Sequence, residues 1–91
     1  LGSADQEEVE GIYRDRKLLD SAETLIKEKM YGQAAEVLKK VTEKKLEGKK
    51  HVMSGYLAAA QGDCTKAWAA FGEARKKGED CIPEEYQGKC K

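Results

Sequence analysis

Apolar residues recur every three or four positions through the first half of the chain, which is the spacing of a helix with one buried face. From residue 5 to about residue 29, the apolar stripe comprises Val9, Ile12, Leu19, Ala22, Leu25 and Ile26. From residue 31 to about residue 46, it comprises Ala34, Val37, Leu38 and Val41. Polar and charged side chains fill the remaining positions. The pattern therefore predicts two amphipathic helices joined by a short loop.

The second half repeats this pattern and carries clearer helix ends. Helices are predicted over residues 49–61 and 63–77, and a single helical turn over residues 84–87. Gly48 marks the break before them, Gly62 suits the end of the first, and Asp63 or Thr65 suits the N-cap of the next. No polar/apolar alternation persists long enough to predict a strand. Short loops favour antiparallel neighbours, so we expect an all-α fold of four main helices and a C-terminal capping turn after Pro83.

Small residues recur at matching positions in the two halves. Gly55 and Ala67 follow Ala22 and Ala34 by the same 33 positions, which is typical of a helix–turn–helix repeat. The second half resembles a tetratricopeptide repeat through Gly55, Ala67, Phe71, Ala74 and the turn at residues 61–63. Its departures from the family pattern are His51, Ser54 and Ala58. The first half keeps the two alanines and resembles the family less closely.

This resemblance implies two degenerate repeats and divides the chain accordingly. The segments are a tag remnant (1–3), an N-terminal helical extension (4–14), a first repeat (15–48), a second repeat (49–80) and a capping tail (81–91). In the family, small residues such as Gly55 and Ala67 face each other across a hairpin, and the first helix of each repeat lines a concave groove. The implied partner-binding positions are Leu19, Glu23, Ile26, Val52, Met53 and Tyr56. The same surface would include Arg16, Asp20, Lys27, Lys49, Ala59 and Ala60.

The function implied by the resemblance is a non-enzymatic protein-interaction module, cut from a larger protein. Its partner would be a peptide or a helix, because Val52, Met53 and Tyr56 form a mildly apolar strip suited to such ligands. The carboxylate clamp of chaperone-binding family members uses Asn, and this sequence contains no Asn. Two repeats are few for a stable stack. The alternative is therefore an assembly domain that forms a homodimer, or stacks on flanking repeats, without a separate ligand.

Three cysteines, Cys64, Cys81 and Cys90, bear on the compartment and on the C-terminus. Their number slightly favours an exported protein, periplasmic or extracellular, with one disulfide; three free thiols would suit a cytoplasmic protein. Cys64 and Cys81 bracket a predicted helix and would lie about 20 Å apart, too far for a bridge. A tail that runs back along this helix makes Cys64–Cys90 the first choice. Cys81–Cys90 is the second.

Charge and motif content argue against several function classes. The 17 basic and 17 acidic residues cancel, and the basic stretch 39–50 lacks interleaved aromatic residues, so no nucleic-acid partner is expected. No apolar run approaches the roughly 18 residues of a membrane span, so no membrane contact is expected. No catalytic constellation, cofactor motif or zinc spacing occurs, and the chain is not expected to be an enzyme. His51 and Trp68 are expected to pack, Trp68 against the tail.

Overall fold

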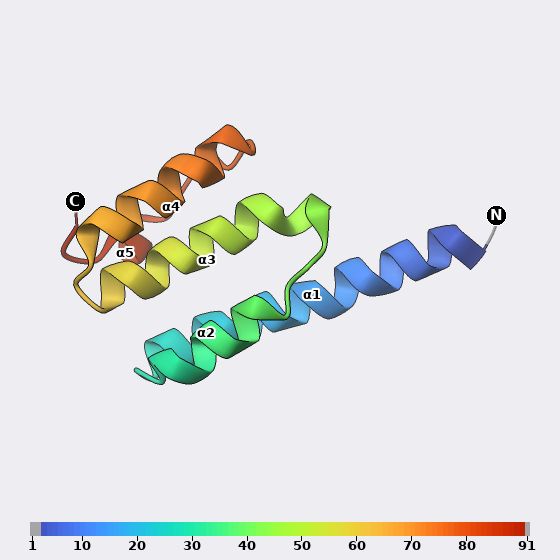
Figure 1. Ribbon diagram of the computed structural model, residues 1–91, viewed down its shortest axis with the longest axis horizontal. Helices are drawn as coiled ribbons and strands as arrows, with labels where there is room; N and C mark the ends of the chain where they lie inside the picture. Colours follow the sequence, from blue (N-terminus) through green and yellow to red (C-terminus); the bar gives the residue numbers. More distant parts are fainter. Residues whose placement is uncertain (1–2, 91) are drawn as a thin grey trace.

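Helices joined by loops make up the part of the chain that the structure describes. The computed structural model describes the backbone of residues 3–90 and the side chains of residues 10–90 (Figure 1). Its elements are α1 (Ser3–Lys27), α2 (Tyr31–Lys39), the 3-10 turn η1 (Lys44–Leu46), α3 (Glu47–Ala60), α4 (Cys64–Lys76) and α5 (Glu84–Gln87). Residues 3–90 contain no strand. The predicted all-α class, with four main helices and a C-terminal turn, is therefore confirmed, whereas most of the expected tag remnant lies outside the described residues.

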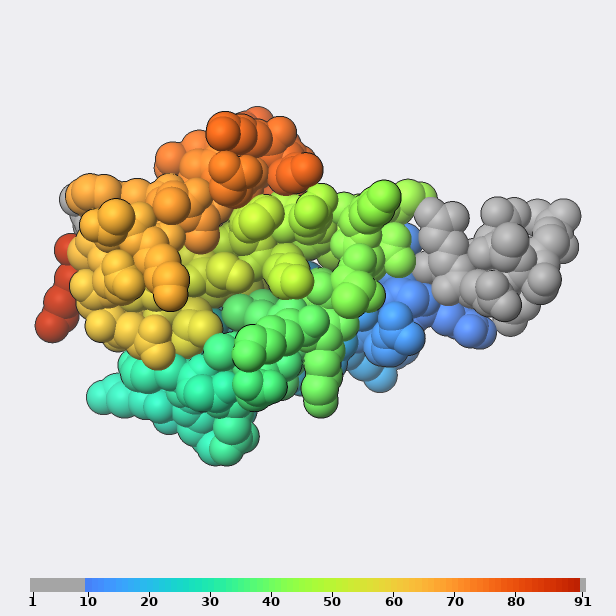
Figure 2. Space-filling model, in the orientation of Figure 1, coloured from blue at the N-terminus to red at the C-terminus, as the bar shows by residue number. Residues whose placement is uncertain are grey.

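Two antiparallel hairpins make up the body of the molecule. α1 pairs with α2, α3 pairs with α4, and α3 also packs against α1, α2 and α5. The N-terminal half of α1 extends beyond the other helices (Figure 1). On the face drawn in Figure 2, α2, α3 and α4 lie side by side, and most of the chain after α4 is hidden behind them. Among residues 3–90, no helix combines the length and the apolar character needed to cross a membrane.

The residues after α4, numbers 79–90, form a segment that we call the returning tail. Glu79 lies beside the start of α3, with its carboxylate 3.8 Å from the Lys49 Nζ atom. Farther along, α5 packs on α3. Gly88 lies at the end of α3, where an added Cβ would be 3.8 Å from the Ala59 Cβ. The returning tail therefore follows α3 from its first turn to its last.

The ends of α3 and α4 follow the predicted glycine and capping signals. Gly62 and Gly78 have φ values of 81° and 95°, in the left-handed region that glycine adopts without steric cost. Asp63 is the N-cap of α4, and its side chain accepts a hydrogen bond of 3.1 Å from the Lys66 backbone N–H. Of the two predicted caps, the structure uses Asp63, while Thr65 lies inside the helix.

The predicted extent of the second helix is wrong. α2 ends at Lys39 rather than near residue 46, and residues 41–43 are not helical. The Asp15 carboxylate, buried on α1, accepts hydrogen bonds from the backbone N–H groups of Thr42 and Glu43 at 3.1 and 2.9 Å. These amides are thus satisfied by a side chain instead of by a helix. The β-branched pair Val41 and Thr42 also favours extended backbone.

Two glycines allow close packing inside helices. Gly48 was expected to separate the hairpins, but it lies buried in the first turn of α3. A Cβ there would be 2.8 Å from the Glu79 Cγ, so the missing side chain admits the returning tail. Within α3, a Cβ on Gly55 would be only 2.6 Å from the Phe71 Cδ1. The three atoms nearest to this Cβ all belong to the Phe71 ring, so Gly55 leaves room for that ring.

The hydrophobic core lies between the two hairpins and continues beneath the returning tail. Its buried members include Leu19, Ala22, Leu38, Val41, Leu46, Val52, Met53, Ala58, Ala59, Ala67, Phe71, Ala74, Tyr86 and Cys90. Six residues of the predicted stripes are buried, namely Leu19, Ala22, Ile26, Ala34, Leu38 and Val41. Ile12, Leu25 and Val37 are partly exposed, and the side chain of Val9 lies outside the described set.

Candidate partner-binding groove

A groove of about 480 Å³ lies between α1, α3 and the returning tail. We call it the α1–α3 groove. Its lining comprises Arg16, Leu19, Asp20 and Glu23 from α1, Lys49, Val52 and Met53 from α3, and Glu79, Cys81, Pro83 and Tyr86 from the tail. Apolar side chains from both hairpins thus form part of its surface, and charged side chains stand on each wall. This combination suits a ligand with both apolar and charged groups.

The structure places four of the six predicted partner-binding residues at this groove. They are Leu19, Glu23, Val52 and Met53. Ile26 is buried in the core and does not line the groove. Tyr56 is partly buried beneath another ring and also lies outside the lining. Leu19, Val52 and Met53 are themselves largely buried, so they form the floor of a groove and not an open apolar strip.

The charged side chains of the groove differ in how they are paired. Lys49 and Glu79 form an ion pair across α3 and the returning tail. Glu23 pairs with Lys27 at 3.1 Å within α1. Arg16 and Asp20 are exposed and form no salt bridge within the described side chains. A charged ligand would therefore meet these last two groups without first breaking an ion pair.

The returning tail is a part of the site that the sequence did not reveal. Its Tyr86 ring stacks on the Tyr56 ring of α3, with centroids 4.4 Å apart. Burial, together with a hydrogen bond to Glu23, raises the pKa of Tyr86 from 10.0 to about 12. Burial likewise raises the pKa of Tyr56. Tyr86 therefore joins the tail to both α3 and α1. The sequence predicted the helical turn that α5 forms, but it gave no indication that the Tyr86 ring would stack on the Tyr56 ring.

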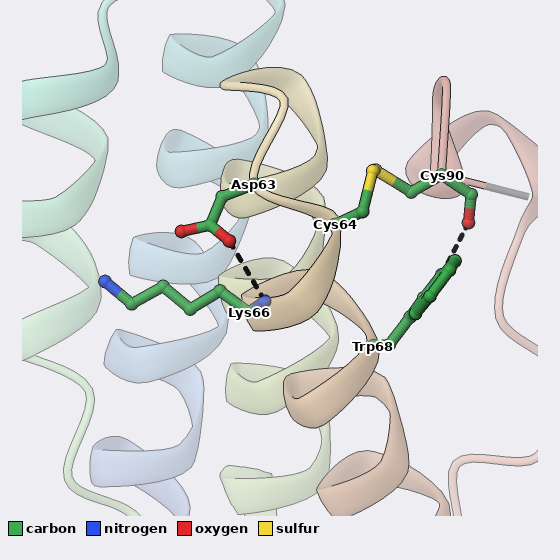
Figure 3. The surroundings of a disulfide bond; sticks show 5 residues. All are labelled: Asp63, Cys64, Lys66, Trp68 and Cys90. Atoms are coloured by element: carbon green, nitrogen blue, oxygen red, sulfur yellow. Dashed lines mark hydrogen bonds between the residues drawn. A yellow bond between two sulfur atoms is a disulfide. The ribbon is translucent and has the colours of Figure 1, made fainter.

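A disulfide closes the far end of the returning tail. Cys64 at the start of α4 and Cys90 are bonded, with Cα atoms 5.2 Å apart (Figure 3). The first-choice pairing is confirmed and the second choice, Cys81–Cys90, is wrong, because Cys81 is exposed and unpaired. Trp68 lies beside the bridge and donates a hydrogen bond from Nε1 to the Cys90 carbonyl at 2.6 Å (Figure 3). Trp68 thus contacts the tail as expected, although its side chain is 56% exposed.

The remaining candidates for chemistry stand apart from the groove. His51 is partly buried on α3. Within the described part of the chain, no three His, Cys, Asp or Glu side chains are placed to hold one metal ion.

Comparisons with protein-family models, with curated proteins and with solved structures found no match for this chain. The geometry of the groove is therefore the basis for a functional proposal.

Proposed function

We propose that the chain is a non-enzymatic protein-interaction module that binds a peptide or a helix of another protein in the α1–α3 groove. We further propose that its two hairpins are degenerate tetratricopeptide-like repeats. Support for the repeats comes from the packing of α3 on both helices of the first hairpin and from the close approach of Gly55 and Phe71. In such repeats the first helix of each hairpin lines the binding surface, and α1 and α3 hold those positions.

The observation that carries the proposal is the composition of the groove. Its floor contains Leu19, Val52 and Met53, and its α1 wall carries Arg16 and Asp20. Interfaces between proteins combine an apolar centre with a polar rim in this way. Methionine adapts its shape to different side chains, which suits a surface that accepts a flexible peptide. The two exposed charges would fix the direction in which the peptide lies.

The proposal is tested by selecting short random peptides on the immobilised chain of residues 1–91 and measuring their affinity by calorimetry. Arg16→Glu should weaken the selected peptides at least fivefold, because it inverts the charge of the groove wall. Arg75→Glu is the matched control, since Arg75 is exposed on the last turn of α4, away from the groove. Equal affinities of wild type and Arg16→Glu would place binding elsewhere and count against the proposal.

The alternative is self-association through α1, favoured by one observation. The N-terminal half of α1 extends past the other helices (Figure 1), and Tyr13 on this segment is largely exposed. A second copy could cover this part of the helix. Sedimentation equilibrium distinguishes the two functions, because an interaction module remains a monomer at micromolar concentration. An assembly domain would instead show a dimer mass that Tyr13→Glu reduces to that of the monomer.

A further inference from the structure

The returning tail covers a face of α3 that would otherwise widen the α1–α3 groove. Tyr86 stacks on Tyr56, and Gly88 lies near Ala59, one turn farther along α3. Tyr86 also lines the groove, so the covered face and the groove are continuous. Val52, Tyr56 and Ala59 lie at intervals of three and four on α3, which places them along one side of the helix. The tail therefore lies where a longer partner segment would lie.

Among the described residues, the backbone of the returning tail makes one hydrogen bond to a distant residue, in which the Cys90 carbonyl accepts from Trp68 Nε1 at 2.6 Å, and its other backbone hydrogen bonds are local. Tyr86 and Cys90 donate their amide protons to the carbonyls of Pro83 and Gln87, and Glu79 donates to Ala74. α5 is a single turn, and a helix of that length has no stability of its own in water. Among the described residues, side-chain contacts and the disulfide are therefore what hold the tail on α3.

The two cysteines of the disulfide differ in exposure. Cys90 is buried, with 1% of its surface exposed, whereas Cys64 is only partly buried at the start of α4. Attack by an external thiolate on a disulfide requires access to one sulfur atom. Cys64 is the less buried of the two residues, so we expect attack at its sulfur atom, and the bond joins the last described residue of the tail to the body of the molecule.

We propose that the Cys64–Cys90 disulfide controls access to the α1–α3 groove by keeping the returning tail on α3, and that reduction by a dithiol opens this face to a partner. The inference rests on the proposed function, since it concerns the same groove. A thiolate of the dithiol attacks the Cys64 sulfur, and Cys90 leaves as a thiolate that takes up a proton. The second thiol of the reductant then closes the reductant's own disulfide and releases Cys64 as a thiol. Two electrons and two protons pass from the dithiol to the chain.

The tail also indicates the chemistry of the segment that would replace it. Glu79 pairs with Lys49, and seven positions later Tyr86 places its ring on Tyr56. Release of the tail leaves Lys49 without Glu79 and the face of the Tyr56 ring without Tyr86. The occupant is therefore an extended segment of a partner protein, with an acidic residue for Lys49 and an aromatic residue for Tyr56. Such a segment reproduces the two contacts that the tail gives up.

The first arm of the test follows the tail itself by amide hydrogen exchange of the ¹⁵N-labelled full chain. Every sample carries Cys81→Ser, so that the third thiol cannot exchange with the bridge. The oxidised chain is compared with the chain reduced by dithiothreitol and with the Cys64→Ser/Cys90→Ser variant. Exchange of the Tyr86 and Cys90 amides should become at least tenfold faster in both of the last two samples.

Amides of α4 serve as the internal control of this arm. Ala67 and Lys77 donate to the carbonyls of Asp63 and Glu73, and their exchange rates should stay within about twofold of the oxidised chain. Unchanged exchange at Tyr86 and Cys90 after reduction overturns the inference, because the tail then stays in place without the bridge. Equal acceleration in α4 also overturns it, because the bridge then supports the whole fold and not the tail alone.

The second arm measures access to the groove. A peptide selected from a random display library on the Cys64→Ser/Cys90→Ser variant is the probe, and its affinity is measured for the oxidised and reduced chains. Binding should be at least tenfold tighter after reduction. If the first arm shows that reduction releases the tail, but the peptide binds the oxidised and reduced chains equally, the disulfide does not control access. The groove then remains a binding site. If no peptide binds either state, the proposed function fails and control of access fails with it, although the tether remains demonstrated.

Discussion

The carboxylate of Asp15 is fully buried on α1 and lies beneath the loop that follows α2. Burial alone would raise its pKa. The backbone N–H groups of Glu43 and Thr42 and the neighbouring Arg14 outweigh this effect and hold the pKa of Asp15 below its ordinary 3.8. The charged form is therefore favoured in the folded chain. A single side chain thus determines where α2 ends and how the first hairpin connects to the second.

Replacing Asp15 should change stability in a pH-dependent way. The contribution of the ionised carboxylate is fully present above its ordinary pKa of 3.8 and is lost as pH falls through the lower folded value. Asp15→Asn should therefore reduce the free energy of unfolding by about 1.5–3 kcal/mol at neutral pH and flatten its decline in acid. Urea unfolding at neutral and acidic pH measures both effects. Asp20→Asn, on the exposed side of the same helix, should change neither, and an equal loss at every pH in Asp15→Asn would contradict the assignment.

Gly55 and Gly72 make a matched pair with opposite expected effects. Gly55→Ala should destabilise the chain, because overpacking against the Phe71 ring costs about 1–3 kcal/mol and better helix propensity returns only about 1 kcal/mol. Gly72, within α4, has no atom within 4 Å of an added Cβ. Gly72→Ala should therefore stabilise the chain by about 0.5–1 kcal/mol. Thermal unfolding of both variants gives the signs, and stabilisation by Gly55→Ala would show that the two helices of this hairpin do not pack at Phe71.

Among the elements, the returning tail differs most from the helices because it is held by few, well-separated contacts. They are the Lys49–Glu79 ion pair, the Tyr56–Tyr86 stack, the hydrogen bonds from Trp68 to the Cys90 carbonyl and between Tyr86 and Glu23, and the disulfide. The ion pair is partly exposed to solvent and contributes little. The disulfide joins residues separated by 26 positions, for which the chain-entropy model gives a stabilisation of about 3–4 kcal/mol. The covalent bond therefore dominates the stability of this element.

The tyrosine pair gives the tail a response to alkaline pH. The folded pKa of Tyr86, about 12, lies above its ordinary value of 10.0. The stabilisation it gives is therefore fully present below pH 10 and is lost as pH rises toward 12. In a tyrosinate absorbance titration, Tyr86→Phe should remove the step near 12 from a chain with four tyrosines. Tyr13→Phe, an exposed ring on α1, is the control; persistence of that step in Tyr86→Phe would assign it to another ring.

Helix positions could be predicted from the sequence because each depends on residues close together in the chain. Apolar spacing located α1, and the signals at Gly48, Gly62, Asp63 and Gly78 located α3, α4 and the turn between them. The end of α2 could not be predicted in this way, because it depends on a hydrogen bond between residues 27 positions apart. An acid at position 15, in register with Leu19 and Ala22 on the apolar stripe, was the only signal of that contact.

At the scale of the whole molecule, the sequence located the walls of the groove but not its cover. Four of the residues that the resemblance suggested, Leu19, Glu23, Val52 and Met53, line one groove. The resemblance also placed Tyr56 there as an exposed group, whereas the structure stacks it under Tyr86. A repeat pattern predicts which side of a helix faces the concave surface. It does not predict which other segment of the chain covers that side. The geometric argument for Cys64–Cys90 and the expected packing of Trp68 both indicated a tail that returns, but along α4, whereas in the structure α5 packs on α3.

We propose that the α1–α3 groove binds a partner, and the place where a selected peptide binds shows whether it does. Titration of a peptide selected on the full chain into the ¹⁵N-labelled chain reports this through changes in amide chemical shift. The largest changes should occur at Arg16, Asp20, Lys49 and Val52, which line the groove. Changes confined to α2 and α4, on the face drawn in Figure 2, would contradict the claim.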